Sequence, residues 1–368
     1  MLGGGRILIH QNGDREFIML FGKKKDIIGI DIGSRTIKVA EVEENKKGRT
    51  IKKFGMIDIA PGLIEEGAVK NPEAVAYLIR QLFNSQKIKE NNVAVSIGGY
   101  STIVKNISVP AMDEAQLQEM IQFEAEQYIP FDINDVNLDF QIIGENEINP
   151  NQMNVLLVAA KKEMINDYVN LVQMAGLNPC IIDVDAFALQ NIYEINYDGN
   201  GENVALVDIG ANKTTLNILK ENFSVFMRDV SMGCQQISAK IVSLADCTLE
   251  EAEELYHNEE TDRISDKEII EIVSSVVTSW CTEIGRALDF FYSTYPGDQI
   301  PRIILSGGGA KIKKFRELLA AETSSEVEII RPFEKFSIGG DFDRSYLEQV
   351  APQAAISLGL AIRKIDDK

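Results

Sequence analysis

The chain has 368 residues, 45% hydrophobic and 25% charged, a balance typical of a globular protein with roughly two to four domains. Its formal net charge of −19 argues against nucleic acid as a partner, because phosphate contacts need a basic face, and against direct adsorption to anionic lipid. No apolar run approaches the roughly 20 residues of a membrane span. The four cysteines form no CxxC pair and there are only two histidines, which argues against a zinc site and favours free thiols in a cytosolic protein.

The first 18 residues do not resemble the start of a domain. They contain Asp14, Arg15 and Glu16 and no long apolar region, so they do not form a secretory signal. The sequence changes in character at Met19, where the segment MLFGKKK begins. We expect Met19 to be the natural start and residues 1–18 to be a disordered or non-native extension.

Strand signals alternate with helical signals along the chain, which predicts α/β lobes. The first half predicts strands at 26–32, 36–43, 51–58 and 92–98, with a helix that starts at Asn71-Pro72 before the last of them. A unit of different texture follows, with a strand, a helix, two strands and a helix at 102–109, 113–128, 137–143, 153–160 and 161–175. Its size is that of a small inserted subdomain, and a helix over Asp183–Glu194 is expected to return the chain to the first lobe.

The second half predicts a strand hairpin over 203–219. A capping box at Thr248 and Glu251 begins a short helix, and a long helix follows over about 267–293. A strand over 302–306 then enters a glycine-rich loop and a helix, and Pro352 is expected to start the last helix.

The most informative feature is a strand–turn–strand pattern that occurs once in each half. Residues 26–39 read DIIGIDIGSRTIKV and residues 203–216 read NVALVDIGANKTTL. A glycine turn lets backbone N–H groups approach a phosphate, and an acid beside it can hold a hydrated Mg²⁺. The candidate phosphate-binding residues are Asp31, Gly33, Ser34, Arg35 and Lys38 in the first turn and Asp208, Gly210, Ala211 and Asn212 in the second. Either turn alone is also compatible with a plain β-turn and a solvated aspartate, and it is the duplication that favours a phosphate clamp.

A third motif, LSGGGAKI over residues 305–312, joins a strand to a helix. Gly307, Gly308 and Gly309 present no side chains, so a flat ring can lie on the backbone near a helix N-terminus. The alternative is a flexible connecting loop. No P-loop, no GxGxxG after a strand and no GxSxG elbow is present.

In this order and at these separations the three motifs resemble the actin and sugar-kinase superfamily. The segments MLFGKKKDIIGIDIGSRTIKVAEV and ISVPAMDEAQLQEMIQFEAEQYIPFDINDVNLDF are similar to the PilM family of type IV pilus proteins, which is related to the division protein FtsA. The resemblance covers about residues 19–365. It implies a two-lobed, actin-like fold of α/β class, a duplicated ribonuclease H-like unit with a small inserted 1C subdomain. The implied division is 19–98 plus 183–201 for subdomain 1A, 99–182 for 1C, 202–232 plus 276–368 for 2A and 233–275 for 2B.

The resemblance also implies ATP between the lobes with Mg²⁺. Asp31 and Asp208 would hold the metal, through water, while Lys38 reaches the phosphates and Gly307–Gly309 form the adenosine loop. The ribose-side helix of such proteins often reads Ala-Glu-x-x-Lys. Here Glu253 matches the acid, but Tyr256 replaces the lysine.

For partners, the resemblance implies the cytoplasmic N-terminal peptide of a PilN-like membrane protein, bound in a groove between 1A and 1C. It implies a link to the pilus motor ATPases, a possible homo-oligomeric ring, and a cytoplasmic location at the inner membrane through partner proteins only. The chain ends Ile365-Asp366-Asp367-Lys368, which is not the C-terminal amphipathic helix of FtsA. With no clear base for activating water, we expect slow or no ATPase activity.

Two other functions remain open from the sequence. A small-molecule kinase on the same scaffold needs a catalytic aspartate facing an acceptor hydroxyl, for which Asp183 and Asp185 are the candidates. An FtsA-like division protein would form filaments with ATP.

Overall fold

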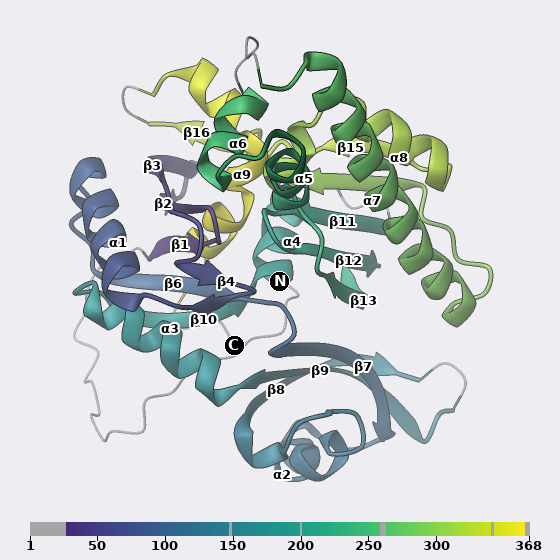
Figure 1. Ribbon diagram of the computed structural model, residues 1–368. Coiled ribbons are helices and arrows are strands. Elements are labelled where there is room, and N and C mark those ends of the chain that lie inside the picture. Colours follow the sequence, from purple (N-terminus) through teal and green to yellow (C-terminus); the bar gives the residue numbers. More distant parts are fainter. Residues whose placement is uncertain (1–26, 147–148, 199–200, 258–262, 340–341, 365–368) are drawn as a thin grey trace.

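The computed structural model describes residues 27–146, 149–198, 201–257, 263–339 and 342–364. The expected extension 1–18 and the C-terminal residues 365–368 lie outside these ranges. The described residues form two α/β lobes side by side and a small sheet below them (Figure 1).

Each lobe is built on a sheet, and the two sheets share one strand order. The first runs β10-β6-β1-β2-β3, with β16 added at its edge, and the second runs β13-β12-β11-β14-β15. In both, three consecutive antiparallel strands continue into two parallel strands. The strands of the first sheet are β1 (Ile28–Ile32), β2 (Thr36–Asn45), β3 (Gly48–Asp58), β6 (Asn92–Ile97), β10 (Asn178–Val184) and β16 (Ser337–Ile338). Those of the second are β11 (Val204–Ile209), β12 (Thr214–Lys220), β13 (Phe223–Val230), β14 (Arg302–Ser306) and β15 (Glu326–Ile329). The repeated order confirms the predicted duplicated, two-lobed fold.

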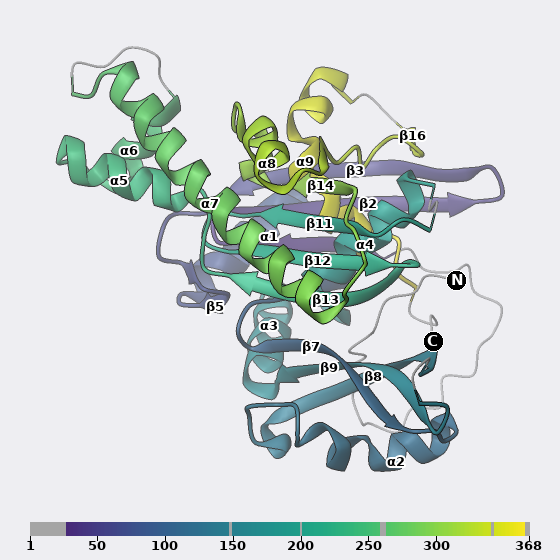
Figure 2. The same cartoon turned by 90° about the vertical axis from the view of Figure 1, so that its right-hand side faces the viewer.

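Helices cover the outer faces of both sheets because the side chains on those faces are apolar. The first sheet packs on α1 (Pro72–Gln86), with Asn71 as its N-cap and Pro72 at N1 as predicted, and on α3 (Lys162–Met174). The second sheet packs on α5 (Gln235–Ala245), α6 (Leu249–His257), α7 (Asp266–Thr294) and α8 (Phe315–Thr323). Figure 2 shows α5 and α6 projecting at one end of the sheets, in the predicted 2B region.

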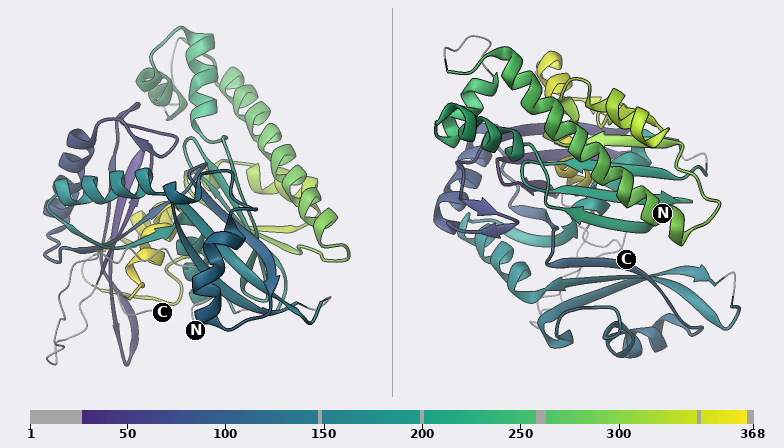
Figure 3. Two further views of the ribbon diagram at one scale, coloured as in Figure 1. Left: turned by 90° about the horizontal axis from the view of Figure 1, so that it is seen from below. Right: turned by 45° about the vertical axis from the view of Figure 1, so that its right-hand side comes forward.

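Two helices, α4 (Asp185–Asn196) and α9 (Arg344–Ala361), lie between the sheets, where they share one apolar cluster with both lobes (Figures 1 and 3). They meet backbone to backbone. A Cβ at Gly359 would overlap the Ala188 carbonyl, and a Cβ at Gly29 on β1 would overlap the Ser357 carbonyl. Glycine is therefore required at both positions for the lobes to approach this closely.

The inserted unit is a three-stranded sheet of order β7-β9-β8 with α2 (Glu114–Ala125) on its outer face. Its strands are β7 (Thr102–Pro110), β8 (Val136–Glu145) and β9 (Gln152–Lys161), and the short elements nearby are β4 (Ile64–Glu65), β5 (Ala68–Val69) and η1 (Ile133–Asp135). Two elements inside the predicted insertion 99–182 lie elsewhere: α3 packs on α1, and β10 pairs with β6 of the first sheet. The subdomain boundaries themselves stay predictions.

The last helix begins earlier than expected. It starts at Arg344, where the Asp343 side chain accepts hydrogen bonds from the Ser345 and Tyr346 amides, so Pro352 lies inside the helix and does not start it. The helix continues past the proline because Leu347 and residues beyond it are buried between the lobes. Packing here outweighs the loss of one helical hydrogen bond.

We expect Gly359→Ala to lower the free energy of unfolding by about 3 kcal/mol or more, because the new Cβ forces α9 away from α4. Gly285→Ala in α7 is the matched control, since its Cβ would meet only the Glu322 side chain at 3.6 Å. A helix interior gains roughly 0.5–1 kcal/mol from that change. Urea denaturation of both variants measures the difference, and equal stabilities would contradict the close crossing.

Candidate functional site

The first hairpin places an aspartate and a lysine side by side at the end of its strands. Asp31 on β1 and Lys38 on β2 are directly opposite in the antiparallel register, and Lys38 Nζ lies 3.0 Å from Asp31 Oδ2. Burial raises the pKa of Asp31, and the Lys38 ammonium partly offsets this. The Gly33 N–H donates to the Thr36 carbonyl at 3.1 Å within the turn, so this amide is already used. Among the described residues, the amides of Ser34 and Arg35 have no hydrogen-bond acceptor and are the turn's available donors.

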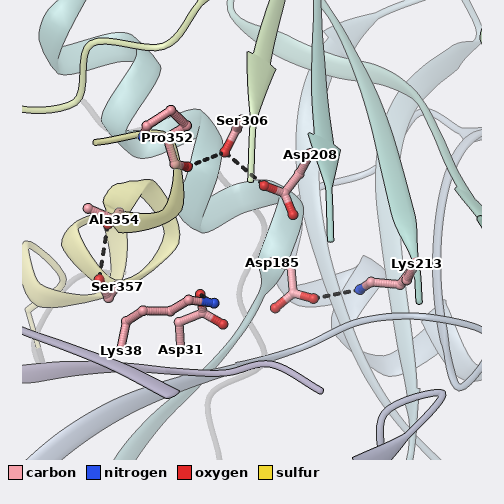
Figure 4. A network of polar contacts seen from close by, with 9 residues as sticks. All are labelled: Asp31, Lys38, Asp185, Asp208, Lys213, Ser306, Pro352, Ala354 and Ser357. Carbon is pink, nitrogen blue, oxygen red and sulfur yellow. Dashed lines mark hydrogen bonds and ion pairs between the residues drawn. The ribbon is translucent and has the colours of Figure 1, made fainter. Parts of the chain in front are cut away.

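The second hairpin faces the first with a carboxylate of its own (Figure 4). Asp208 on β11 lies beside Ser306 on β14, whose hydroxyl donates to Asp208 Oδ1 at 2.7 Å. Withdrawal from water raises the pKa of Asp208 to about 6, although the Ser306 hydrogen bond favours the ionised form. The turn repeats the first one, because the Gly210 N–H donates to the Lys213 carbonyl at 2.9 Å.

An ion pair crosses from the second hairpin to the start of α4. Lys213 Nζ lies 2.6 Å from Asp185 Oδ2. Burial alone would raise the pKa of Asp185, but the Lys213 ammonium holds it below its ordinary value. Burial likewise opposes the charge on Lys213, but Asp185 and Asp229 outweigh it and raise the lysine pKa. Lys213 lies within the DIGANKTT segment of the second hairpin, but its spacing in the sequence does not identify it as a site residue.

A second contact spans the lobes at the outer end of the hairpins. The Arg35 guanidinium pairs with the Glu253 carboxylate of α6, and it also donates to the Ile59 carbonyl at 2.9 Å. The structure thus brings together two predicted site residues from opposite lobes. Glu253 is engaged by a protein cation, which an incoming ligand would have to share or replace.

The glycine-rich loop has a packing explanation as well as a ligand explanation. It forms a short 3₁₀ turn, η2 (Gly308–Lys311). Gly307 has φ +81°, and side chains at Gly307 and Gly309 would overlap Ile209. Of the three, only Gly308 has space for a side chain, because the nearest atom to a Cβ built there is Gln353 Nε2 at 3.7 Å. Two of the three glycines are therefore needed by the fold itself.

The facing hairpins suit a cation bound through its water molecules better than a cation coordinated directly by side chains. In the described ranges, no group of three or more His, Cys, Asp or Glu side chains is arranged to hold a metal ion. Asn212 Oδ1, in the second turn, is buried without a hydrogen-bond partner. A metal-bound water or a ribose hydroxyl would supply the missing donor. The residues present therefore fit a phosphate ligand with a hydrated Mg²⁺.

The two aspartates considered for a kinase are both paired. Asp183 is fully buried, and its Oδ2 lies 2.9 Å from Nε of Arg363, which follows α9. Asp185 is bound to Lys213. Asp183 is therefore shielded from an acceptor hydroxyl, whereas Asp185 keeps 20% of its side chain exposed and is occupied by the Lys213 ammonium.

Two sheets of one strand order, joined through α4 and α9 and facing each other with paired Asp-Ile-Gly hairpins, define a two-lobed actin-like protein. The family model described as type IV pilus assembly protein PilM matches residues 29–365, so the chain belongs to the PilM family. A solved chain of the PilM–PilN type IV pilus biogenesis complex is similar at 26% identity and a TM-score of 0.82, covering 94% of this chain and 100% of that one. The ethanolamine utilization protein EutJ from Carboxydothermus hydrogenoformans is 14% identical with a TM-score of 0.57, covering 92% and 90%, and shares the fold.

Membership of this family gives the protein a role in type IV pilus assembly. Within the part of the chain that the structure describes, no helix combines the length and apolar character needed to cross a bilayer.

The raised pKa of Asp208 predicts a pH-dependent stability. Because the folded pKa of about 6 exceeds the ordinary value of 3.8, the contribution of this group is present below pH 4 and is lost as the pH rises through 6. We expect wild type to lose about 1–3 kcal/mol relative to Asp208→Asn between pH 4 and pH 7. Ser306→Ala, which removes the bond to the ionised form, moves that loss to higher pH. Urea unfolding across this range measures it, and a pH-independent difference would contradict the assignment.

Proposed function

We propose that the protein is an ATP-binding scaffold of the type IV pilus inner-membrane assembly platform. The observation that carries this proposal is the pair of acidic hairpins, one from each lobe, whose carboxylates Asp31 and Asp208 face each other between the lobes (Figure 4). Membership of the PilM family supplies the pilus context. ATP bound between the lobes would contact both and so fix their relative position.

The charges around the cleft favour ATP bound together with Mg²⁺. Within the described part of the chain, the ammonium groups that act on Asp31, Asp185 and Asp208 are those of Lys38 and Lys213. A triphosphate alone would be repelled by this net negative charge, whereas a divalent cation offsets it. Asp31 and Asp208 would hold the hydrated metal.

The phosphates would accept hydrogen bonds from the turn amides, and the glycine loop at 307–309 would lie under the adenosine. The metal supplies charge neutralisation at the phosphates when bound. Asp183 is buried and tied to Arg363, and the sequence offers no clear base for activating water, so we infer slow or absent turnover.

The inner face of the inserted sheet supports a peptide partner. Asn106, Leu156 and Gln141 share one rung across β7, β9 and β8, on the face away from α2. Asn106 Oδ1 and Gln141 Oε1 are buried without hydrogen-bond partners. Backbone N–H groups of an extended peptide would satisfy such acceptors.

We therefore propose that the cytoplasmic N-terminal peptide of a PilN-like protein binds between the predicted 1A and 1C subdomains. In this proposal the protein is cytoplasmic and reaches the inner membrane only through such partners. It would link the platform to the pilus motor ATPases, as a single copy or in a homo-oligomeric ring.

Isothermal titration calorimetry with ATP and Mg²⁺ tests the nucleotide site. We expect binding by wild type and at least about ten-fold weaker binding by Asp31→Ala and Asp208→Ala, since each removes a ligand of the hydrated metal. Asp298→Ala is the control, because Asp298 pairs with Lys220 outside the cleft. No binding by wild type, or undiminished binding by both cleft variants, would contradict the proposal.

Titration of a synthetic PilN N-terminal peptide tests the partner. We expect Gln141→Ala to weaken binding about five-fold or more through loss of one buried hydrogen bond. Gln122→Ala changes the same residue type on the exposed side of α2 and should leave affinity unchanged. Equal affinities for both variants would place the peptide elsewhere.

A further inference from the structure

The connection from the first lobe to the inserted sheet is held from the second lobe. This connection, residues 98–101, joins β6 to β7. The Gly99 N–H donates to Asp229 Oδ2 on β13 at 2.6 Å. Asp229 Oδ1 in turn accepts from the Thr215 hydroxyl on β12 at 2.6 Å. The entry to β7 is therefore positioned by side chains of the other lobe.

The Lys213–Asp185 pair lies against the same connection. A Cβ at Gly98 would overlap the Lys213 ammonium and the Asp185 carboxylate, so the ion pair fills the space beside this backbone. Gly98 does not have a positive φ, so its lack of a side chain is explained by this packing and not by backbone strain.

One lysine thus touches three parts of the molecule. Lys213 belongs to the turn of the second phosphate hairpin, its ammonium binds the first residue of α4, and its side chain packs on the connection to β7. It also lies within electrostatic reach of Asp208 and Asp229. Lys213 and Asp185 keep 30% and 20% of their side-chain surface exposed, so an anion in the cleft has access to this pair.

We propose that Lys213 is a relay between the cleft and the inserted sheet, an inference that rests on the proposed nucleotide binding for its ligand. Without ligand, Lys213 binds Asp185 and holds Gly98 and Gly99 in place. A phosphate group bound at the second hairpin competes with Asp185 for the ammonium. When Lys213 turns to the phosphate, the connection loses its packing partner and β7 changes position relative to β13.

Contacts between β7 and β13 would transmit this change in the position of β7 to the inner face of the inserted sheet. Asn106 Nδ2 donates to the Ser224 and Val225 carbonyls of β13, at 3.3 and 3.0 Å. Asn106 stands four residues along β7 from Thr102, whose amide donates to the Gly99 carbonyl at 3.0 Å. A shift at Gly99 is thereby carried to the rung proposed for peptide binding.

Hydrogen exchange of the full chain, read at residues 99–106, tests the relay. In ligand-free protein we expect Lys213→Ala to exchange about five-fold faster there than wild type, the effect of losing one partly exposed ion pair. Lys220→Ala is the matched control: Lys220 is the last residue of β12, the strand that follows Lys213, and the change removes a pair with Asp298 at 3.0 Å. Gly98→Ala should reproduce the acceleration by displacing the ammonium, and it should add less than about two-fold in the Lys213→Ala background.

A second experiment repeats the hydrogen-exchange measurement in the presence of ATP and Mg²⁺. Wild type should show faster exchange at 99–106 on binding, whereas Lys213→Ala should bind with no further change there. If Lys213→Ala and Lys220→Ala exchange alike without ligand, or if ATP alters 99–106 equally in wild type and Lys213→Ala, the relay is wrong. If ATP binds no variant, the proposed nucleotide function fails, and the ligand-free comparison still decides whether Lys213 holds the connection.

Discussion

Carboxylates gathered at the facing ends of two sheets are the constraint on which the rest of the structure depends. Asp31 and Asp208 each lie one residue before the end of an apolar strand, and the fold withdraws both from water and holds them near each other. Such groups are costly unless a cation or a proton compensates them. Lys38 compensates Asp31 only in part, and the pKa of both carboxyl groups is raised. This residual demand for positive charge is the physical basis for the proposal that the cleft binds a metal-bound phosphate.

The two lobes are joined next to this cleft where α4 crosses α9. Because Gly359 of α9 lies directly against the Ala188 carbonyl of α4, the lobes are closely apposed at this crossing. Above the crossing, the contacts between lobes are polar: Lys213 with Asp185, and Arg35 with Glu253. Partly exposed polar pairs of this kind contribute little stability, whereas the apolar cluster around α4 and α9 is buried and holds the lobes together.

The sequence pattern predicted the two hairpins and much of the fold, whereas contacts between residues far apart in the sequence could not be predicted from it. The hairpins were predictable because an apolar run, an Asp-Ile-Gly turn and a second run specify strand pairing, which places Lys38 opposite Asp31. The partners of Asp183 and Asp185 were not, since Arg363 and Lys213 are distant in sequence and are brought close only by the packing of α9 and the second lobe. β10 was not predicted because Asn178-Pro179 resembles a turn, although the strand is paired with β6. The glycine loop was noticed for its lack of side chains, but its contact with Ile209 is visible only in three dimensions.

A crystal structure of the protein with a non-hydrolysable ATP analogue and Mg²⁺ tests the central claim most directly. The account predicts the triphosphate between the two hairpins, with phosphate oxygens within hydrogen-bond distance of the Ser34 and Asn212 amides and a hydrated metal beside Asp31 and Asp208. A nucleotide bound elsewhere, or Lys213 still paired with Asp185 at saturating nucleotide, would contradict it.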